Sequence, residues 1–277
     1  MMMDIKGWRY YNHAAVPTTS PDVKANLAPI HDGSIWKIGG GYALLARWTT
    51  NWDCKYETNW WYVIKDTPFD ISSLKAKRRY EINKGKRNFT VKRINPSDYR
   101  EELYLVTLEA LQGWPEKYRP HVEKNEFYTH LNSLTSTIVY AAFSQKDEKM
   151  AGYAYLTVMG KNLDFNVLRT RPDCERDGVN AAIVAFILED NSGIIDNGNF
   201  ICDGSRSIRH ETGFQDYLEK YFGFRKAYCD LQIRYRKPIK AIVDILYQLR
   251  RPLKKLDNIG FIHSINALLE MEKIVRN

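Results

Sequence analysis

The chain has 277 residues, of which 44% are hydrophobic and 27% charged, a composition typical of a globular protein with a sizeable core. No apolar run approaches the roughly 20 residues that a membrane-spanning helix needs, and Met1 to Asn12 lack the apolar core of a secretion signal. These features argue against an integral membrane or secreted protein and predict a cytoplasmic one.

The cysteines and histidines show no pattern of a disulfide framework or a zinc site. Cys54, Cys174, Cys202 and Cys229 form no C-x-x-C pair, and the six histidines are scattered. We therefore predict reduced thiols and no metal, with a site assembled from distant segments as the alternative.

The net charge of +8 is concentrated in one segment. Between Lys75 and Arg93 there are nine basic residues and one acid, Glu81, and from Lys237 to Asp257 there are six basic residues and two acids. Such segments attract polyanions: CoA phosphates, a tRNA or an anionic membrane face. A solvated helix face is the alternative for each.

The first thirty or so residues, with Pro17, Pro21 and Pro29, predict a largely irregular arm that aromatic residues anchor. Strands are predicted within 34–48, with a turn at Gly39 to Gly41, and over 60–65, and a helix over 70–86.

From residue 89 onward the hydrophobic periodicity is clearer. It predicts strands at 89–94, 136–144, 151–159, 163–169, 199–202 and 228–235, and helices at 99–111, 123–134, 179–190 and 212–222. Residues 239–275 form a helical tail. The order β-α-α-β-β-β-α-β-α-β predicts an α/β fold (α+β, with a mixed sheet) covered by helices.

Four stretches carry a family resemblance: L-K-A-K-R-R-Y-E-I-N-K-G-K (74–86), F-I-C-D-G-S-R-S (200–207), F-Q-D-Y-L-E-K-Y-F-G-F (214–224) and C-D-L-Q-I-R-Y (229–235). With the element order, they resemble FemAB-like proteins of the GNAT acyltransferase superfamily over about residues 60–236. The run D-G-S-R-S departs from the D-F-G-R-S-like pattern, because its glycine and arginine are not adjacent.

The resemblance implies a GNAT acyltransferase fold with a partial N-terminal GNAT-like half and a C-terminal helical tail. The domains expected from it are an arm and partial half with the basic helix (1–87), the acyltransferase domain (88–236) and the tail (237–277).

The resemblance also implies where the donor binds. GNAT enzymes hold the donor diphosphate on amide groups at the start of the helix after the fourth strand, where the helix dipole favours an anion. The corresponding residues here are Val167, Leu168, Arg176, Gly178, Val179 and Asn180. Asp177 puts a negative charge there, so a plain helix start capped by Asp177 is the alternative.

Acceptor residues are predicted on the strand 163–169 and in a loop. Asp164 and Asn166 are polar on an otherwise apolar strand, which is costly if they are buried without partners. We expect them to line the acceptor cleft with Trp114; a wet strand face and a packing anchor are the alternatives.

Reacting groups are expected at 202–207 and on the following helix. Asp203 would accept a proton from the attacking amine, Ser205 would donate to the developing oxyanion, and Arg206 would bind an anionic substrate group. By resemblance, Tyr221 would protonate a thiolate leaving group. The alternatives are a turn-and-cap cluster for 203–207 and a core position for Tyr221.

The leading functional hypothesis is transfer of an acyl group from acetyl-CoA or another acyl-CoA to an amine of a small-molecule, sugar, peptide or other cell-envelope precursor. The first alternative keeps the fold but uses an aminoacyl-tRNA, bound through the basic helix 74–87. The second is a catalytically inactive GNAT-like binding module. The tail predicts either peripheral membrane contact through its basic residues or packing against the domain.

Overall fold

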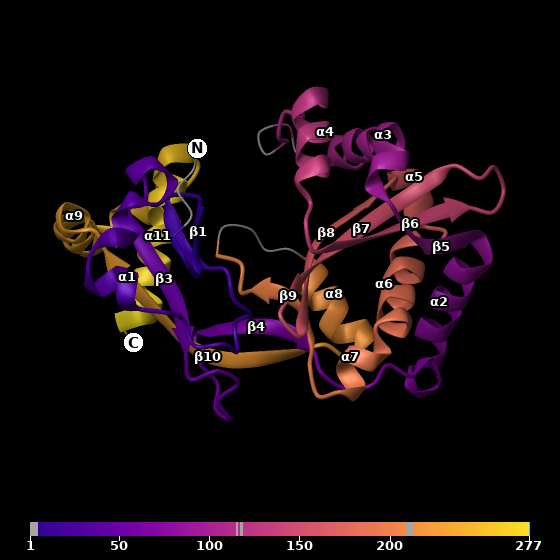
Figure 1. Cartoon of the computed structure of the whole chain (residues 1–277), viewed down its shortest axis with the longest axis horizontal. Coiled ribbons are helices and arrows are strands. Elements are labelled where there is room, and N and C mark those ends of the chain that lie inside the picture. Colours follow the sequence, from indigo (N-terminus) through magenta and orange to yellow (C-terminus); the bar gives the residue numbers. More distant parts are fainter. Residues whose placement is uncertain (1–4, 115, 117–118, 209–212, 277) are drawn as a thin grey trace. The chain divides into compact units, whose positions relative to one another are not determined.

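The structure, a computed structural model, describes residues 5–114, 116, 119–208 and 213–276. It divides into two compact units that are each built from separated segments (Figure 1). The first contains Met1–Val63, Ser205–Asp216 and Lys226–Asn277, and the second contains Ile64–Gly204 and Tyr217–Arg225. The domain boundaries expected from the sequence, after residues 87 and 236, stay a prediction.

The first unit is built on a set of strands in the order β1-β2-β3-β10-β4. Their bounds are β1 (Trp8–Tyr11), β2 (Ala14–Pro17), β3 (Leu45–Thr50), β4 (Trp60–Lys65) and β10 (Arg225–Tyr235). β1 and β2 form an antiparallel hairpin, β2 pairs parallel with β3, and β3 pairs antiparallel with β10. The described part of the predicted irregular arm is therefore partly regular: it contains β1, β2 and the short helix α1 (Ala28–His31).

The strand predicted from residue 34 is wrong over its first half. Ser34–Gly41 forms the 3-10 helix η1, and the strand β3 begins only at Leu45. Gly39 has a φ of +60°, and a Cβ on it would lie 2.4 Å from the Tyr10 ring, so the chain here must both turn left-handed and pass close to β1. The short helix brings Ile35 and Ile38 into a core with Trp8.

The second unit has the strand order β9-β8-β7-β6-β5. The bounds are β5 (Phe89–Ile94), β6 (Thr137–Ser144), β7 (Met150–Met159), β8 (Asn162–Thr170) and β9 (Ile201–Ser205). β5 to β8 are antiparallel neighbours, and β9 is parallel to β8. The predicted mixed sheet and its meander of three strands are confirmed.

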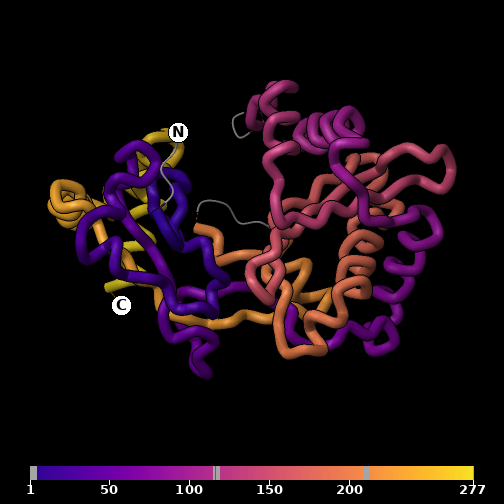
Figure 2. Tube along the Cα trace, in the orientation of Figure 1, coloured from indigo at the N-terminus to yellow at the C-terminus, as the bar shows by residue number. Residues whose placement is uncertain are grey.

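Helices cover both faces of this sheet (Figures 1 and 2). On one face lie α3 (Arg100–Gln112) and α4 (Lys124–Ser133), whose Leu103, Val106 and Leu131 pack onto β6 and β7. On the other lies α6 (Val179–Asp190), with eight of its twelve residues buried. α6 is apolar on all sides because α2 (Ala76–Asn88) covers it.

The remaining helices differ in detail from the prediction. The predicted helix 70–86 begins only at Ala76, after the 3-10 turn η2 (Ile71–Ser73), which Asp70 caps through the Ser72 amide at 2.8 Å. Three further short helices, η3 (Pro96–Tyr99), α5 (Pro172–Glu175) and α7 (Ser192–Asp196), were not foreseen. The described part of the predicted helix 212–222 is α8 (Gly213–Phe222); Thr212 lies outside the described residues.

Two glycines allow α2 to lie directly on the start of α6. A Cβ on Gly85 would come within 2.3 Å of the Gly178 carbonyl oxygen. Two ion pairs flank this contact: Lys84 with Asp177 at 3.0 Å and Lys86 with Glu189 at 2.6 Å. Part of the positive charge of α2 is therefore neutralised by acidic residues of the same unit and does not face solvent alone.

The predicted helical tail consists of α9 (Lys237–Gln248), α10 (Arg250–Lys254) and α11 (Gly260–Arg276). In the first unit, Val243 and Leu269 form a core cluster with Leu45 and Tyr235. One face of the tail thus packs against the strands of the first unit. Packing against the domain was one of the two alternatives predicted for the tail. No helix in the described ranges has the length and apolar character needed to cross a bilayer.

All four cysteines are free thiols, and their environments predict different reactivities. Cys229 is buried, and burial raises its pKa to about 12. Burial and the neighbouring Asp173 raise the pKa of Cys174 to about 11. Because the thiolate is the reacting form, iodoacetamide at pH 8 is expected to modify Cys174 at least about tenfold more slowly than the thiol of a short unstructured peptide, and Cys229 only after unfolding. Peptide mass spectrometry over a time course measures these rates; labelling of Cys229 in the native protein as fast as that of the peptide thiol would contradict the expectation.

Candidate donor and acceptor site

The first feature of the candidate site is an opening between two parallel strands of the second unit. β8 and β9 pair at only two positions among the described residues, Leu163 with Ile201 and Asp164 with Cys202. β8 nevertheless continues to Thr170. From Asn166 onward, no strand of the described residues pairs with the edge of β8 that faces β9, and backbone groups at such an edge bind extended ligands by adding a strand.

A bulge lies at the same point of β8. Tyr155 of β7 is opposite Val167 and Leu156 is opposite Phe165, so Asn166 is an extra residue on β8. The Asn166 amide donates to Asp164 at 3.0 Å and accepts from the Thr157 hydroxyl at 2.6 Å. The two polar residues predicted for the acceptor cleft are thus hydrogen-bonded to each other, two positions apart on β8.

Polar and aromatic side chains gather on the α3 side of the sheet. Val167 packs with Tyr153 and Tyr155, while the Arg169 guanidinium lies 5.2 Å from the centre of the Trp114 ring. The structure thus connects Trp114, predicted for the acceptor pocket, to β8. Burial raises the pKa of Tyr155 and raises that of Tyr153 to about 12, so both phenols are neutral hydrogen-bonding groups at neutral pH.

The predicted donor loop lies directly beyond the open part of β8. Gly178, with a φ of +87°, precedes the first residue of α6, Val179, and Asn180 accepts a hydrogen bond from the Thr170 hydroxyl at 3.0 Å. The first amide groups of α6 have no intrahelical acceptor, and the helix dipole adds positive potential. Arg176 is exposed beside them.

The Asp177 carboxylate in this loop is compensated by α2. Lys84 forms an ion pair with Asp177 at 3.0 Å and donates to the Arg176 carbonyl oxygen at 2.7 Å. In the sequence, the negative charge of Asp177 argues against an anion site at this loop. The structure pairs that charge with Lys84, which lies about ninety residues away in the sequence. Of the six predicted donor residues, Val167 and Leu168 lie on β8, Arg176 is the C-cap of α5, and Gly178, Val179 and Asn180 form the start of α6.

No protein-family model matches the sequence, and the search of curated proteins found no match. Solved structures with a similar fold include the C-terminal domain of a lysylphosphatidylglycerol synthetase from Agrobacterium fabrum, with 14% identity and a TM-score of 0.50, covering 86% of this chain and 84% of that one. L-PGS from Bacillus licheniformis has 12% identity and a TM-score of 0.52, covering 98% and 85%. FemX has 9% identity and a TM-score of 0.53, covering 87% and 85%.

The chain has a GNAT-like fold of the FemAB-like kind. The order of elements predicted from residue 89 onward is confirmed. At these identities the likeness shows the fold alone.

Within the FemAB-like fold, the predicted reacting groups fall in both units. Asp203 lies on β9 in the second unit, directly after Cys202, the partner of Asp164. Because side chains alternate along a strand, Asp203 and Asp164 lie on opposite faces. Ser205 and Arg206 belong to the first unit.

Arg206 is held by β4 in the first unit. Its backbone amide donates to the Trp61 carbonyl at 2.8 Å, and its guanidinium donates to the Asn59 carbonyl at 2.7 Å. The guanidinium lies 4.7 Å from the centre of the Trp61 ring, and the Lys226 ammonium lies 4.6 Å from the same ring. Two cations on one aromatic ring form a positively charged surface that an anionic group can approach.

Tyr221 of α8 lies beside α2. The Arg78 guanidinium stacks 3.0 Å above its ring and forms an ion pair with Glu81 at 2.5 Å. A hydrogen bond from Lys220, with the positive charges of Lys220 and Arg78, lowers the pKa of the Tyr221 phenol. A phenol with a lowered pKa is a stronger acid; the role of Tyr221 as a general acid stays a prediction.

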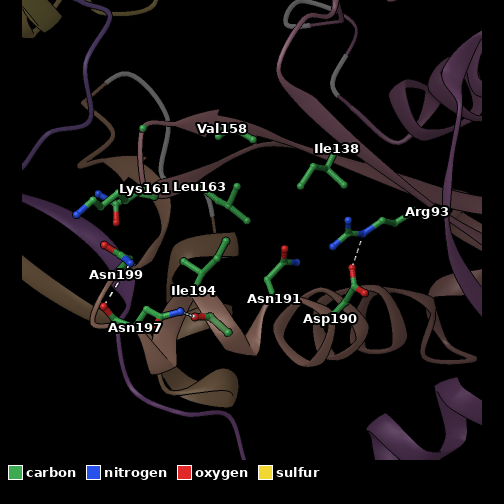
Figure 3. A pocket seen from close by; sticks show the side chains of 13 residues that line it. Arg93, Ile138, Val158, Lys161, Leu163, Asp190, Asn191, Ile194, Asn197 and Asn199 are labelled. Atoms are coloured by element: carbon green, nitrogen blue, oxygen red, sulfur yellow. Dashed lines mark hydrogen bonds and ion pairs between the residues drawn. The ribbon is translucent and has the colours of Figure 1, made fainter.

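A hollow of about 560 Å³ lies at the opposite end of α6 from the donor loop (Figure 3). Several of its polar lining groups are bonded to the protein itself: Arg93 pairs with Asp190 at 2.6 Å, and Asn191 donates to Tyr140 at 2.8 Å. This hollow is therefore a poorer candidate than the strand opening. No group of three or more His, Cys, Asp or Glu residues in the described part of the chain could hold a metal ion.

Two residues of the site escaped the sequence analysis, Arg169 and Tyr155. Arg169 ends an apolar strand, and Tyr155 is one of several aromatic residues in 151–159, so only the register of β7 against β8 singles them out. Because residues i and i+2 of a strand lie on the same face, the predicted strand 163–169 already places Arg169 on the face of Val167.

Proposed function

We propose that this chain transfers an aminoacyl group from an aminoacyl-tRNA to a nucleophilic acceptor. The opening of β8 from β9 beyond Asp164 is the observation that carries the proposal. A donor's acyl arm would lie along the free edge of β8, bonded to the backbone of Val167 and Leu168, with the anionic part of the donor near the start of α6.

The chemistry required is acyl substitution. The acceptor's amine or hydroxyl attacks the carbonyl carbon; a bond to the acyl group forms, and the bond from the carbonyl carbon to the leaving oxygen breaks. In the proposed step Asp203 takes the proton that the nucleophile loses, and Tyr221 supplies the proton that the leaving group takes up.

Two observations support an aminoacyl-tRNA over the acyl-CoA that the sequence favoured. The similar proteins with the highest coverage include lysylphosphatidylglycerol synthetases, whose name gives a lysyl group as the one transferred. In addition, Lys75, Lys77 and Arg87 of α2 are exposed and form no ion pair with any residue that the structure describes, which leaves three cations for phosphates. Acyl-CoA remains the second candidate, because the start of α6 has the amide groups that a diphosphate needs.

The two donors are separated by a binding experiment on the whole chain. Anisotropy of labelled tRNA is measured against salt concentration for the wild type, for Lys75→Gln/Lys77→Gln/Arg87→Gln, and for the matched control Lys24→Gln/Lys37→Gln/Lys146→Gln, which removes three exposed cations elsewhere. The α2 variant is expected to reduce the salt slope by about 2 to 3, and the control to leave it nearly unchanged.

Acetyl-CoA gives the contrasting result. If it stabilises the chain by about 5 °C at a hundredfold excess over its Kd while both triple variants bind tRNA alike, the donor is an acyl-CoA. If neither ligand binds, the transferase proposal fails and the inactive binding module takes its place.

A further inference from the structure

Helix α9 of the tail is apolar on two faces, and only one of them is packed. Ile239, Val243 and Leu246 lie in the core cluster that joins the tail to the strands of the first unit. Ile242, Ile245 and Leu249 are 51%, 65% and 50% exposed. Positions i, i+3 and i+7 of a helix share one side, so these three side chains form a single outward stripe.

The segment after α9 also exposes apolar side chains. Leu256, Ile259 and Phe261 are 46%, 48% and 76% exposed. Single exposed apolar side chains are ordinary, but six within twenty residues of one tail are not. Burying them elsewhere would be favourable, by about 25 cal/mol for each Å² of apolar surface removed from water.

The charges beside these residues are predominantly positive; hydrogen bonds from Asn266 and His263, together with the charges of His263 and Lys254, lower the pKa of Asp257. Arg251, Lys254 and Lys255 are exposed and form no ion pair with a described residue. The neighbouring acids are already engaged: Asp244 pairs with Lys240 at 2.5 Å, and Asp257 is bonded to His263 at 2.9 Å and to Asn266 at 2.8 Å. The exposed apolar side chains suit an apolar partner, and the exposed cations beside them suit negative charges on that partner.

We propose that this surface, formed by residues 242–261, binds the face of an anionic lipid bilayer. The apolar side chains would enter the boundary between headgroups and acyl chains, and the three cations would contact lipid phosphates. The inference rests on the tail alone and is independent of the proposed transfer activity.

Vesicle cosedimentation of the whole chain tests it. Vesicles of phosphatidylcholine with 30% phosphatidylglycerol are expected to bind the chain, and binding should weaken in high salt and on pure phosphatidylcholine. Lys254→Gln/Lys255→Gln should lower the affinity about 30-fold, because each cation near such a surface contributes on the order of 1 kcal/mol. Ile242→Ser/Ile245→Ser/Phe261→Ser should abolish measurable binding.

The control is Val23→Ser/Val158→Ser, which removes two side chains that are 50% and 40% exposed outside the tail. It should bind vesicles like the wild type, and all variants should keep the wild-type melting temperature because the changed side chains are exposed. Equal binding to neutral and anionic vesicles would overturn the proposal. So would absence of vesicle binding combined with self-association that the Ile242→Ser/Ile245→Ser/Phe261→Ser variant loses, since the surface would then be an interface between copies.

Discussion

Replacing Gly85 by valine is expected to lower the free energy of unfolding by about 3 kcal/mol. A Cβ at this position would lie 2.3 Å from the Gly178 carbonyl oxygen and 3.1 Å from the Ala182 side chain. The oxygen is backbone and accepts the Ala182 amide at 2.9 Å in the first turn of α6, so it cannot move away freely. α2 must instead shift off α6, and the added branching makes the shift larger.

Gly193→Ala is the matched control. Gly193 lies in the short helix α7, and a Cβ there would meet nothing within 4 Å. That substitution is expected to leave stability unchanged or raise it by about 0.5 to 1 kcal/mol. Urea unfolding followed by circular dichroism measures both; a Gly85→Val midpoint equal to the wild type would show that α2 does not need this contact.

The same contact explains why the order of elements was predictable and the site was not. The helix 179–190 and the strands from residue 89 onward follow from local periodicity, which their own side chains determine. The placement of α2 on α6 depends on Gly85 meeting Gly178, a contact between segments about ninety residues apart that no local pattern records.

The error at 34–41 has a local cause. Its apolar residues suit a strand as well as a helical turn, and the choice falls to the left-handed glycines and to the Tyr10 ring that lies against Gly39. The hairpin of β1 and β2 was missed because strands of four residues give too short a pattern to predict.

At the candidate site, the sequence alone indicates which polar residues are of interest, but it does not predict the register of the strands that carry them. Asp164 and Asn166 attracted notice as polar residues on an apolar strand, and the structure joins them by a hydrogen bond. The bulge at Asn166 and the early end of β8–β9 pairing are relations between strands, so the sequence could not give them. The tail shows the same limit, since only the structure tells which apolar face of α9 packs against the strands and which is exposed.

Asp203→Asn is expected to reduce the rate of acyl transfer by about 10² to 10⁴ if its carboxylate accepts the nucleophile's proton as proposed. The amide keeps the shape of the side chain but cannot take up a proton at neutral pH. Single-turnover transfer from whichever donor binds measures the effect, with Asp196→Asn, an exposed aspartate on α7, as the control.

A supporting role in the turn after β9 would give a different pattern. Loss of a structural carboxylate lowers the melting temperature and weakens donor binding together with the rate, whereas loss of a base lowers the rate alone. Asp203→Glu also discriminates, because a longer carboxylate restores part of a proton transfer and does not restore a turn. A rate within twofold of wild type for Asp203→Asn would remove Asp203 from the mechanism and leave the opening between β8 and β9 as a binding site whose base lies elsewhere.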